Sequence, residues 1–219
     1  MKIYIINPDY GMTREEMDSR CGLLQRYAAP DTELFMDCLA RTKVELNSAR
    51  DAVLAGPEIL SMAEAAEAGG ASAVILYCFS DPAAEACRES LSIPVVGGAQ
   101  AACCMVPLMG RRAGVLLADP RRIQEKELFL RSLGLSGDRI AAVDAVDFRG
   151  RSVWEDRDGA LRALLEKGKE LRRRGADVLV LGCLSFLGLG HPLSEALGIP
   201  VIDPAAAAVA LAEALVRQR

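Results

Sequence analysis

Two stretches of this chain, "GGASAVILYCFSDP" at residues 69–82 and "RGADVLVLGCLSFL" at residues 174–187, follow one pattern. In each stretch a run of strand-forming apolar residues ends at a cysteine, Cys78 in the first and Cys183 in the second. The two cysteines stand 105 positions apart, and each stretch is followed by a further match, "IPVV" in one case and "IPVI" in the other. The chain therefore repeats itself, which predicts two similar structural halves.

The apolar runs "AVILY" and "VLVLG" are nearly continuous, as in parallel strands that are buried on both faces of a sheet. Strand-like segments alternate with helical ones along the whole chain, which indicates βαβ units and an α/β fold. The expected strands are 2–7, 33–37, 73–78, 94–96, 113–118, 140–146, 177–182 and 200–202. The expected helices are 13–28, 44–68, 82–91, 99–109, 121–133, 158–174, 192–197 and 204–217.

The repeat predicts two parallel-sheet α/β lobes related by a pseudo-twofold axis, with the active site in the cleft between them. We expect an N-terminal lobe over residues 1–111 and a C-terminal lobe over residues 112–219. The last helix, in residues 205–219, could return to the first lobe. No Gly/Ser-rich linker separates the halves.

Composition excludes several classes of protein. Of 219 residues, 51% are hydrophobic, and the net charge of −4 provides no basic surface for nucleic acid. No apolar stretch approaches the roughly 20 residues of a membrane helix, and "MKIYIINP" is typical of a strand rather than a signal peptide. We therefore expect a cytoplasmic protein with thiols rather than disulfides, a small-molecule substrate, and no nucleic-acid or membrane partner. A homo-oligomer is left open.

The two repeated cysteines are candidates for paired chemistry. Ligands of parallel α/β sheets bind beyond the carboxyl ends of the strands, where both thiols should lie. If the lobes face each other, Cys78 and Cys183 lie on opposite sides of a substrate. A racemase needs such a pair, because one group removes a proton and the other returns one to the opposite face. The alternative is that the cysteines are buried packing residues.

A thiol must ionise to act as a base, and a helix N-terminus favours the anion. After Cys78, the pair Asp81-Pro82 is typical of a helix start, with Asp81 as the N-cap and Pro82 as the first helical residue. Around Cys183 the sequence is less regular, and Ser185 could donate a hydrogen bond or act as a cap.

Several motifs resemble those of the aspartate/glutamate/hydantoin racemase superfamily, and the hydantoin racemase branch most closely. The motifs are "INP" at 6–8, "CFSDPAAEACRE" at 78–89, "IPVVG" at 93–97, "MGRRAGVLL" at 109–117, "LGC" at 181–183 and "GIPVIDPAAAAVALAEAL" at 198–215. The resemblance implies a racemase without cofactor or metal that works by two-base 1,1-proton transfer, with Cys78 and Cys183 as the bases. It also implies that Asn7 orients the substrate. Backbone N–H groups of Phe79, Ser80, Leu184 and Ser185 would hold the carbonyl that becomes enolate-like.

The chain departs from the branch at three places. Asp9 replaces a second asparagine, and Ala118-Asp119 replaces two hydroxyl residues. After the second cysteine, Leu184-Ser185-Phe186 stands where the branch usually has the sequence Ala-Gly-Met. Asp119, a further substrate-binding candidate, should repel a free carboxylate. This favours a neutral hydantoin ring or a ureide such as allantoin over an acidic amino acid.

Two other functions remain open from the residues. A maleate-type cis–trans isomerase also uses two cysteines, one of them as a nucleophile. A non-catalytic small-molecule binding protein could have the same two lobes but would not need the thiol pair. We expect His191, the only histidine, to lie in a loop or at a helix start, and the other five cysteines to be buried. The place of Trp154, in a charged connector, is left open.

Overall fold

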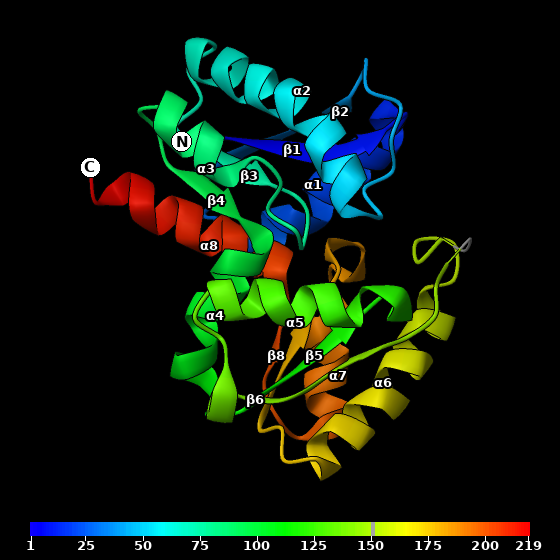
Figure 1. Ribbon diagram of the computed structural model, residues 1–219. Helices are drawn as coiled ribbons and strands as arrows, with labels where there is room; N and C mark the ends of the chain where they lie inside the picture. The colour runs from blue at the N-terminus through cyan, green and yellow to red at the C-terminus, as the bar shows by residue number, and fades with distance from the viewer. Residues whose placement is uncertain (150–151) are drawn as a thin grey trace. The chain divides into compact units, whose positions relative to one another are not determined.

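The computed structural model describes residues 1–149 and 152–219 (Figure 1). The chain divides into two compact units. The first comprises Met1–Gly98 together with Ala205–Arg219, and the second comprises Ala99–Pro204. No helix in the described part of the chain is both long enough and apolar enough to cross a membrane.

The first unit is built on a four-stranded parallel sheet with the order β2-β1-β3-β4. Its strands are β1 (Lys2–Tyr10), β2 (Glu33–Leu39), β3 (Ala73–Leu76) and β4 (Val95–Gly97). Its helices are α1 (Arg14–Leu24), α2 (Ala49–Ala68), α3 (Ala84–Ser90) and α8 (Pro204–Arg217), with a 3₁₀ turn η1 (Gln25–Tyr27). Figure 1 shows α2 and α3 on one side of this sheet and α8 on the other.

The second unit repeats this plan with the order β6-β5-β7-β8, again all parallel. Its strands are β5 (Ala113–Leu117), β6 (Ile140–Ala145), β7 (Val178–Leu181) and β8 (Val201–Ile202). The helices are α4 (Gly98–Met109), α5 (Ile123–Ser132), α6 (Arg157–Arg173) and α7 (Gly190–Leu197). Three 3₁₀ turns complete it: η2 (Pro120–Arg122), η3 (Gly137–Arg139) and η4 (Leu184–Phe186).

The strand register follows the sequence repeat. Val74 pairs with Val95 in the first sheet, and the equivalent Leu179 pairs with Val201 in the second. The expectation of an α/β fold with two similar parallel sheets is therefore confirmed. All four residues of β3 and all four of β7 are buried, which explains their continuous apolar sequences.

Each sheet has its own hydrophobic core. In the first, Ile6 and Leu76 pack with Ile59 of α2 and Cys87 of α3. In the second, strand residues pack with the apolar faces of α6 and α7, through Leu116, Leu179, Leu164, Leu171 and Leu193.

The C-terminal helix α8 is anchored to the first unit by a buried carboxylate. Glu213 is 6% exposed and accepts hydrogen bonds from the backbone N–H of Ala29, at 2.8 Å, and from the hydroxyl of Thr32. Both partners lie in the turn that leads into β2, so this contact joins the last helix to the start of the edge strand.

Several helices begin at other residues than expected from the sequence, among them α2, α3, α5 and α7. The helix expected from residue 44 begins only at Ala49, because Ser48 caps it by accepting a hydrogen bond from the Asp51 N–H at 3.2 Å. Asp81 was expected to cap the next helix, and this is wrong. Helix α3 begins at Ala84, and Ala83 occupies the N-cap position without a side-chain hydrogen bond.

Candidate active site

The first thiol lies at the carboxyl end of the central strands of the first sheet. Tyr77, directly after β3, donates its N–H to Ile6 O at 2.8 Å, which extends the pairing of β3 with β1. Cys78 follows and is half-buried. The extended pairing brings Cys78 to the same sheet end as Asn7, which follows Ile6 on β1.

Asn7 is buried, with 2% of its surface exposed, and its side-chain amide donates to Met12 Sδ at 2.7 Å. The next carboxylate, Asp9, accepts the N–H of Leu46 at 2.8 Å, while Tyr10 donates its N–H to Val44 O at 2.9 Å. Burial raises the pKa of Asp9, although the bond from Leu46 opposes that shift. Asp9, which departs from the family pattern, thus ties the loop after β2 to the last residues of β1, beyond Asn7.

A buried carboxylate that sequence reasoning missed holds the other end of this loop. Glu58 of α2 is 5% exposed and accepts three backbone N–H groups: Ala40 at 2.8 Å, Arg41 at 2.9 Å and Thr42 at 2.6 Å. Burial alone would raise the pKa of Glu58, but these bonds outweigh it and lower the pKa to about 2. The available signal was an acidic residue inside the apolar pattern "AVLAGPEIL" of α2.

Replacing Glu58 by glutamine should lower the free energy of unfolding at pH 7 by about 2 kcal/mol, because three buried amides lose a charged acceptor. The folded-state pKa lies below the ordinary value of 4.5, so the stabilisation is complete above that pH and disappears as the pH falls towards 2. Urea unfolding at pH 7 and pH 3 should show the difference between native protein and Glu58→Gln shrinking in acid. Glu64→Gln, on the exposed face of α2, is the matched control and should change little at either pH. Equal effects of both variants would contradict the prediction.

The backbone after Cys78 is strained. Asp81 has φ 44° and Ala83 has φ 60°, and they are the only non-glycine residues with positive φ in the described chain. Phe79 is buried, at 3% exposure, and Ser80 is half-buried. Left-handed backbone is costly for alanine and persists only where its surroundings impose it.

In the second unit Gly188 occupies the position equivalent to Ala83 and also has a left-handed backbone, with φ 82°. We therefore expect Ala83→Gly to stabilise the protein by about 1 kcal/mol, because glycine adopts this conformation without a steric cost. Gly188→Ala should destabilise it by a similar amount. Urea midpoints of the two variants would test the pair, and shifts in the same direction would contradict it.

The second thiol lies at the corresponding end of the second sheet. Gly182, after β7, donates its N–H to Leu116 O at 2.6 Å. A side chain at Gly182 would overlap Leu117 and the Leu116 carbonyl, so this close approach requires glycine. The half-buried Cys183 comes next and leads into η4, in which Leu184 is buried and Ser185 is half-buried.

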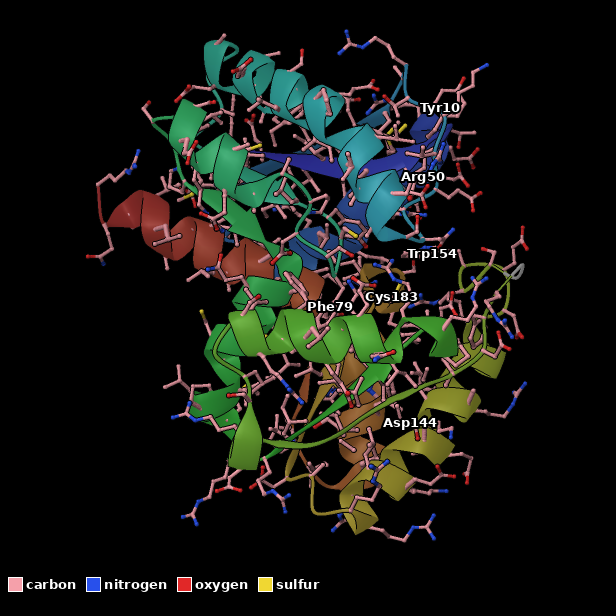
Figure 2. The ribbon with its side chains drawn as sticks, in the orientation of Figure 1. Tyr10, Arg50, Phe79, Asp144, Trp154 and Cys183 are labelled. Carbon is pink, nitrogen blue, oxygen red and sulfur yellow. The ribbon has the colours of Figure 1, made fainter. Side chains whose placement is uncertain are left out.

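Two charged side chains hold the loop after Cys183. Arg157, at the start of α6, donates to Ser185 O at 3.1 Å and to Leu187 O. The second is Asp203, a negatively charged side chain that accepts a hydrogen bond from the N–H of Gly188 at 2.8 Å. The Arg157 guanidinium also lies 4.7 Å from the ring centre of Trp154, and Figure 2 shows that ring near Cys183. Arg157 was not among the residues that the sequence pattern indicates, and the surroundings of Trp154 could not be predicted from it.

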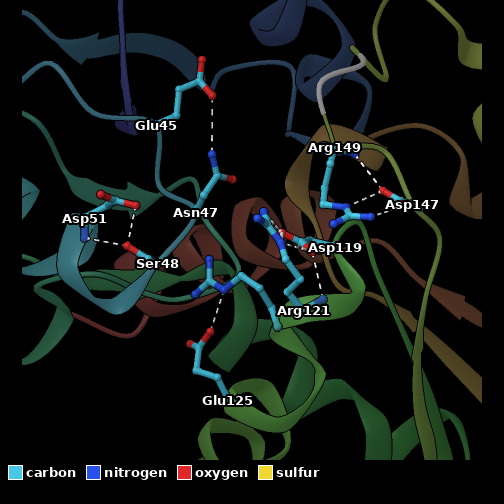
Figure 3. Close-up of polar contacts among 10 residues, drawn as sticks. Glu45, Asn47, Ser48, Asp51, Asp119, Arg121, Glu125, Asp147 and Arg149 are labelled. Carbon is cyan, nitrogen blue, oxygen red and sulfur yellow. Dashed lines mark hydrogen bonds and ion pairs between the residues drawn. The ribbon is translucent and has the colours of Figure 1, made fainter.

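Asp119 also lies at this sheet end, beyond β5, but its charge is already offset. Arg121 contacts both of its carboxylate oxygens, at 3.1, 3.0 and 2.6 Å, and also donates its backbone N–H at 2.9 Å (Figure 3). The side-chain hydrogen bonds from Arg121 are the main reason why the pKa of Asp119 is lowered. A second pair, Arg149 and Asp147, lies nearby (Figure 3). The repulsion expected of Asp119 towards an anionic substrate is therefore weakened.

The remaining candidates have simpler surroundings. As expected, His191 lies near the start of α7; its side chain is exposed and 3.4 Å from Glu195.

All seven cysteines are free thiols. Cys87 and Cys103 are buried as expected, but Cys21 and Cys38 are only half-buried and Cys104 is exposed. Burial raises the pKa of Cys21 and Cys87 to about 11, which disfavours their thiolates. Within residues 1–149 and 152–219, no three His, Cys, Asp or Glu side chains cluster closely enough to hold a metal ion.

Comparison with protein families decides the classification. A family model described as Asp/Glu/Hydantoin racemase matches residues 3–212. The chain belongs to this family. It is an isomerase of the racemase type.

Relatives and solved structures support this membership over the full chain. A hydantoin racemase of Paenarthrobacter aurescens is 31% identical over 99% of this chain and 91% of that protein. A hydantoin racemase of Rhizobium meliloti is 32% identical over 98% of this chain and 88% of that protein. The structure of an allantoin racemase from Klebsiella pneumoniae is similar, with a TM-score of 0.89 and 28% identity, covering 100% of this chain and 88% of the other.

Proposed function

We propose that this protein is a cofactor-independent racemase of a hydantoin-like ring or a ureide, and that it transfers a proton at the carbon next to a carbonyl. The observation that carries the proposal is the equivalence of Cys78 and Cys183. Each is half-buried and directly follows the extension of a buried inner strand, at the sheet end where α/β proteins bind ligands.

In the proposed mechanism, the thiolate of one cysteine removes the proton from the stereogenic carbon. The thiol of the other then donates a proton to the opposite face, so that the two exchange protonation states in each turnover. The proposal requires the two sulfur atoms to approach opposite faces of the substrate. An ordinary thiol is only about 3% ionised at pH 7, so activation of the thiolate is part of the requirement.

The carbanion needs its charge delocalised onto the neighbouring carbonyl oxygen. We assign this task to backbone N–H groups after each thiol, from Phe79, Ser80, Leu184 and Ser185. The loops that carry them are held in place, the second one by Arg157 and Asp203. Asn7, in the carboxyl-terminal half of β1, and Asp119, just beyond β5, are assigned to substrate binding.

The names of the relatives and the chemistry of the site together support the proposed substrate class. The similar proteins carry the names hydantoin racemase and allantoin racemase. Hydantoins and allantoin share a cyclic ureide in which the stereogenic carbon lies next to a ring carbonyl. Deprotonation at that carbon yields an enolate in the ring, which suits donors aimed at one carbonyl oxygen. Because Arg121 offsets the charge of Asp119, we base the preference for a neutral ring on the relatives rather than on repulsion.

Proton NMR in D₂O with reductant would test the proposal directly. The panel holds enantiopure 5-substituted hydantoins, allantoin, aspartate, glutamate and maleate, each with a protein-free control because hydantoins exchange spontaneously. We expect the α-proton signal of a hydantoin or allantoin to disappear above background, together with loss of optical rotation. Conversion of maleate to fumarate would instead indicate the isomerase, and silence across the panel with folded, reduced protein would contradict the proposed function.

A further inference from the structure

The two thiol loops, from Cys78 to Ala83 and from Cys183 to Gly188, occupy equivalent positions in the two units. A carboxylate lies between each loop and the end of the neighbouring strand, but the two carboxylates come from different parts of their units. Cys78 corresponds to Cys183, and the left-handed residues Ala83 and Gly188 correspond at the same offset. Beyond the loops, Val95 and Val201 occupy equivalent register positions, so that Gly97 at the end of β4 corresponds to Asp203 just after β8.

In the first unit the carboxylate comes from the loop. A Cβ atom on Gly97 would overlap the carboxyl carbon and both oxygens of Asp81. The Asp81 carboxylate therefore lies directly on the Gly97 backbone, immediately before the first residue of α4. The missing side chain at position 97 makes room for it.

In the second unit the carboxylate comes from the strand end. Asp203 is 8% exposed, precedes α8, and reaches back to the loop, where it accepts the N–H of Gly188 at 2.8 Å. The loop position equivalent to Asp81 is Phe186, a fully buried side chain. Each unit thus places one carboxylate between its thiol loop and the end of the neighbouring strand, supplied by the loop in the first unit and by the strand end in the second.

A carboxylate at this point binds the thiol loop to a rigid strand end. This matters most in the first unit, where the loop contains two non-glycine residues with positive φ.

We propose that Asp81 and Asp203 are positioning residues, each of which holds one thiol loop in its working conformation through a carboxylate placed at the end of the neighbouring strand. The inference rests on the proposed function for its catalytic consequence. Neither residue needs to touch the substrate. Loss of either carboxylate should let its own loop relax and move its own thiol, leaving the other thiol loop unchanged.

The test is alkylation of each thiol by iodoacetamide at pH 8, resolved by peptide mass spectrometry and made without substrate. Asp81→Ala should accelerate alkylation of Cys78 at least about fivefold and leave Cys183 within twofold, and Asp203→Ala should do the reverse. Turnover should fall about 10- to 100-fold in each variant, as expected when a reacting group is displaced by about 1 Å. Equal changes at both thiols, or none, would overturn the proposal.

A transplant of the second unit's arrangement into the first provides the sharpest control. Asp81→Gly combined with Gly97→Asp restores one carboxylate from the strand side. The double variant should return Cys78 alkylation to within twofold of native and recover most of the turnover lost in Asp81→Gly. A double variant no better than Asp81→Gly would overturn the proposal. Should the alanine variants fail to fold by circular dichroism, Asp81→Asn, which keeps the side-chain shape and removes the charge, gives the same readouts with the same criteria.

These measurements separate the positioning role from the proposed function. If the native protein racemises no compound on the panel, the selective alkylation pattern still supports the positioning role. If racemisation is present and the pattern is absent, the positioning role is wrong and the function stands.

Discussion

Serine in place of Cys78 or Cys183 is expected to lower kcat for racemisation at least about 1000-fold, equivalent to about 4 kcal/mol of lost transition-state stabilisation. Serine is nearly the same size, so a packing role would survive the change. A serine hydroxyl, however, is far less acidic than a thiol and does not supply a base at neutral pH. Racemisation of both enantiomers should be lost, because in the proposed mechanism each direction uses both sulfur atoms.

Exchange of the substrate α-proton with solvent deuterium should further distinguish the roles of the two thiols. With Cys78→Ser, the remaining thiol can still remove and return a proton on its own face, so one enantiomer should exchange its α-proton for deuterium without inversion. Cys183→Ser should show the opposite enantiomer preference. Cys104→Ser, at an exposed thiol on α4, is the control and should match the native protein. Variants that keep more than about a tenth of native turnover would show that the thiols are packing residues or that another pair does the chemistry.

Arg157→Ala should lower turnover about 10- to 100-fold without loss of the fold, since the guanidinium holds two carbonyls of the loop that carries Cys183. Arg157→Lys should recover little of the loss, because an ammonium group cannot reproduce the planar fork that reaches two acceptors and stacks on Trp154. Steady-state racemisation and peptide-resolved alkylation would be measured together, and alkylation should change at Cys183 but not at Cys78.

Arg162→Ala is the matched control on the same helix, because its exposed side chain makes no hydrogen bond or ion pair in the described part of the chain. It should retain native turnover. Equal losses in the Arg157 and Arg162 variants would show that the effect comes from net charge or from α6 itself rather than from the contact with the thiol loop.

The two thiols can be located from the sequence pattern, but the groups that hold their loops cannot. The strands before Cys78 and Cys183 are short, apolar and repeated, and such local patterns can be recognised without knowledge of the fold. Glu58, Arg157 and Asp203 hold backbone groups 15 to 30 positions away in the chain. No local pattern specifies such partners, and the sequence around each reads as an ordinary helix or helix start.

The wrong expectation for Asp81 has the same origin. An Asp-Pro pair is a strong local signal for a helix start, and helix α3 does begin nearby, at Ala84. The carboxylate instead lies on Gly97, a residue that comes close only after β3 and β4 have paired. Tertiary packing overrode a local preference that is worth only about 1 kcal/mol.

By itself the sequence determined the α/β class, the repeated parallel sheets and the two cysteines at equivalent strand ends, because these depend on hydrophobic periodicity and on the repeat. Only the tertiary structure decided which charges hold the thiol loops, that Asp119 is paired with Arg121, and that Trp154 packs on Arg157. The physical reason is that hydrophobic patterning acts over a few residues, whereas a buried charge is positioned by whichever distant backbone groups the folded sheet brings to it.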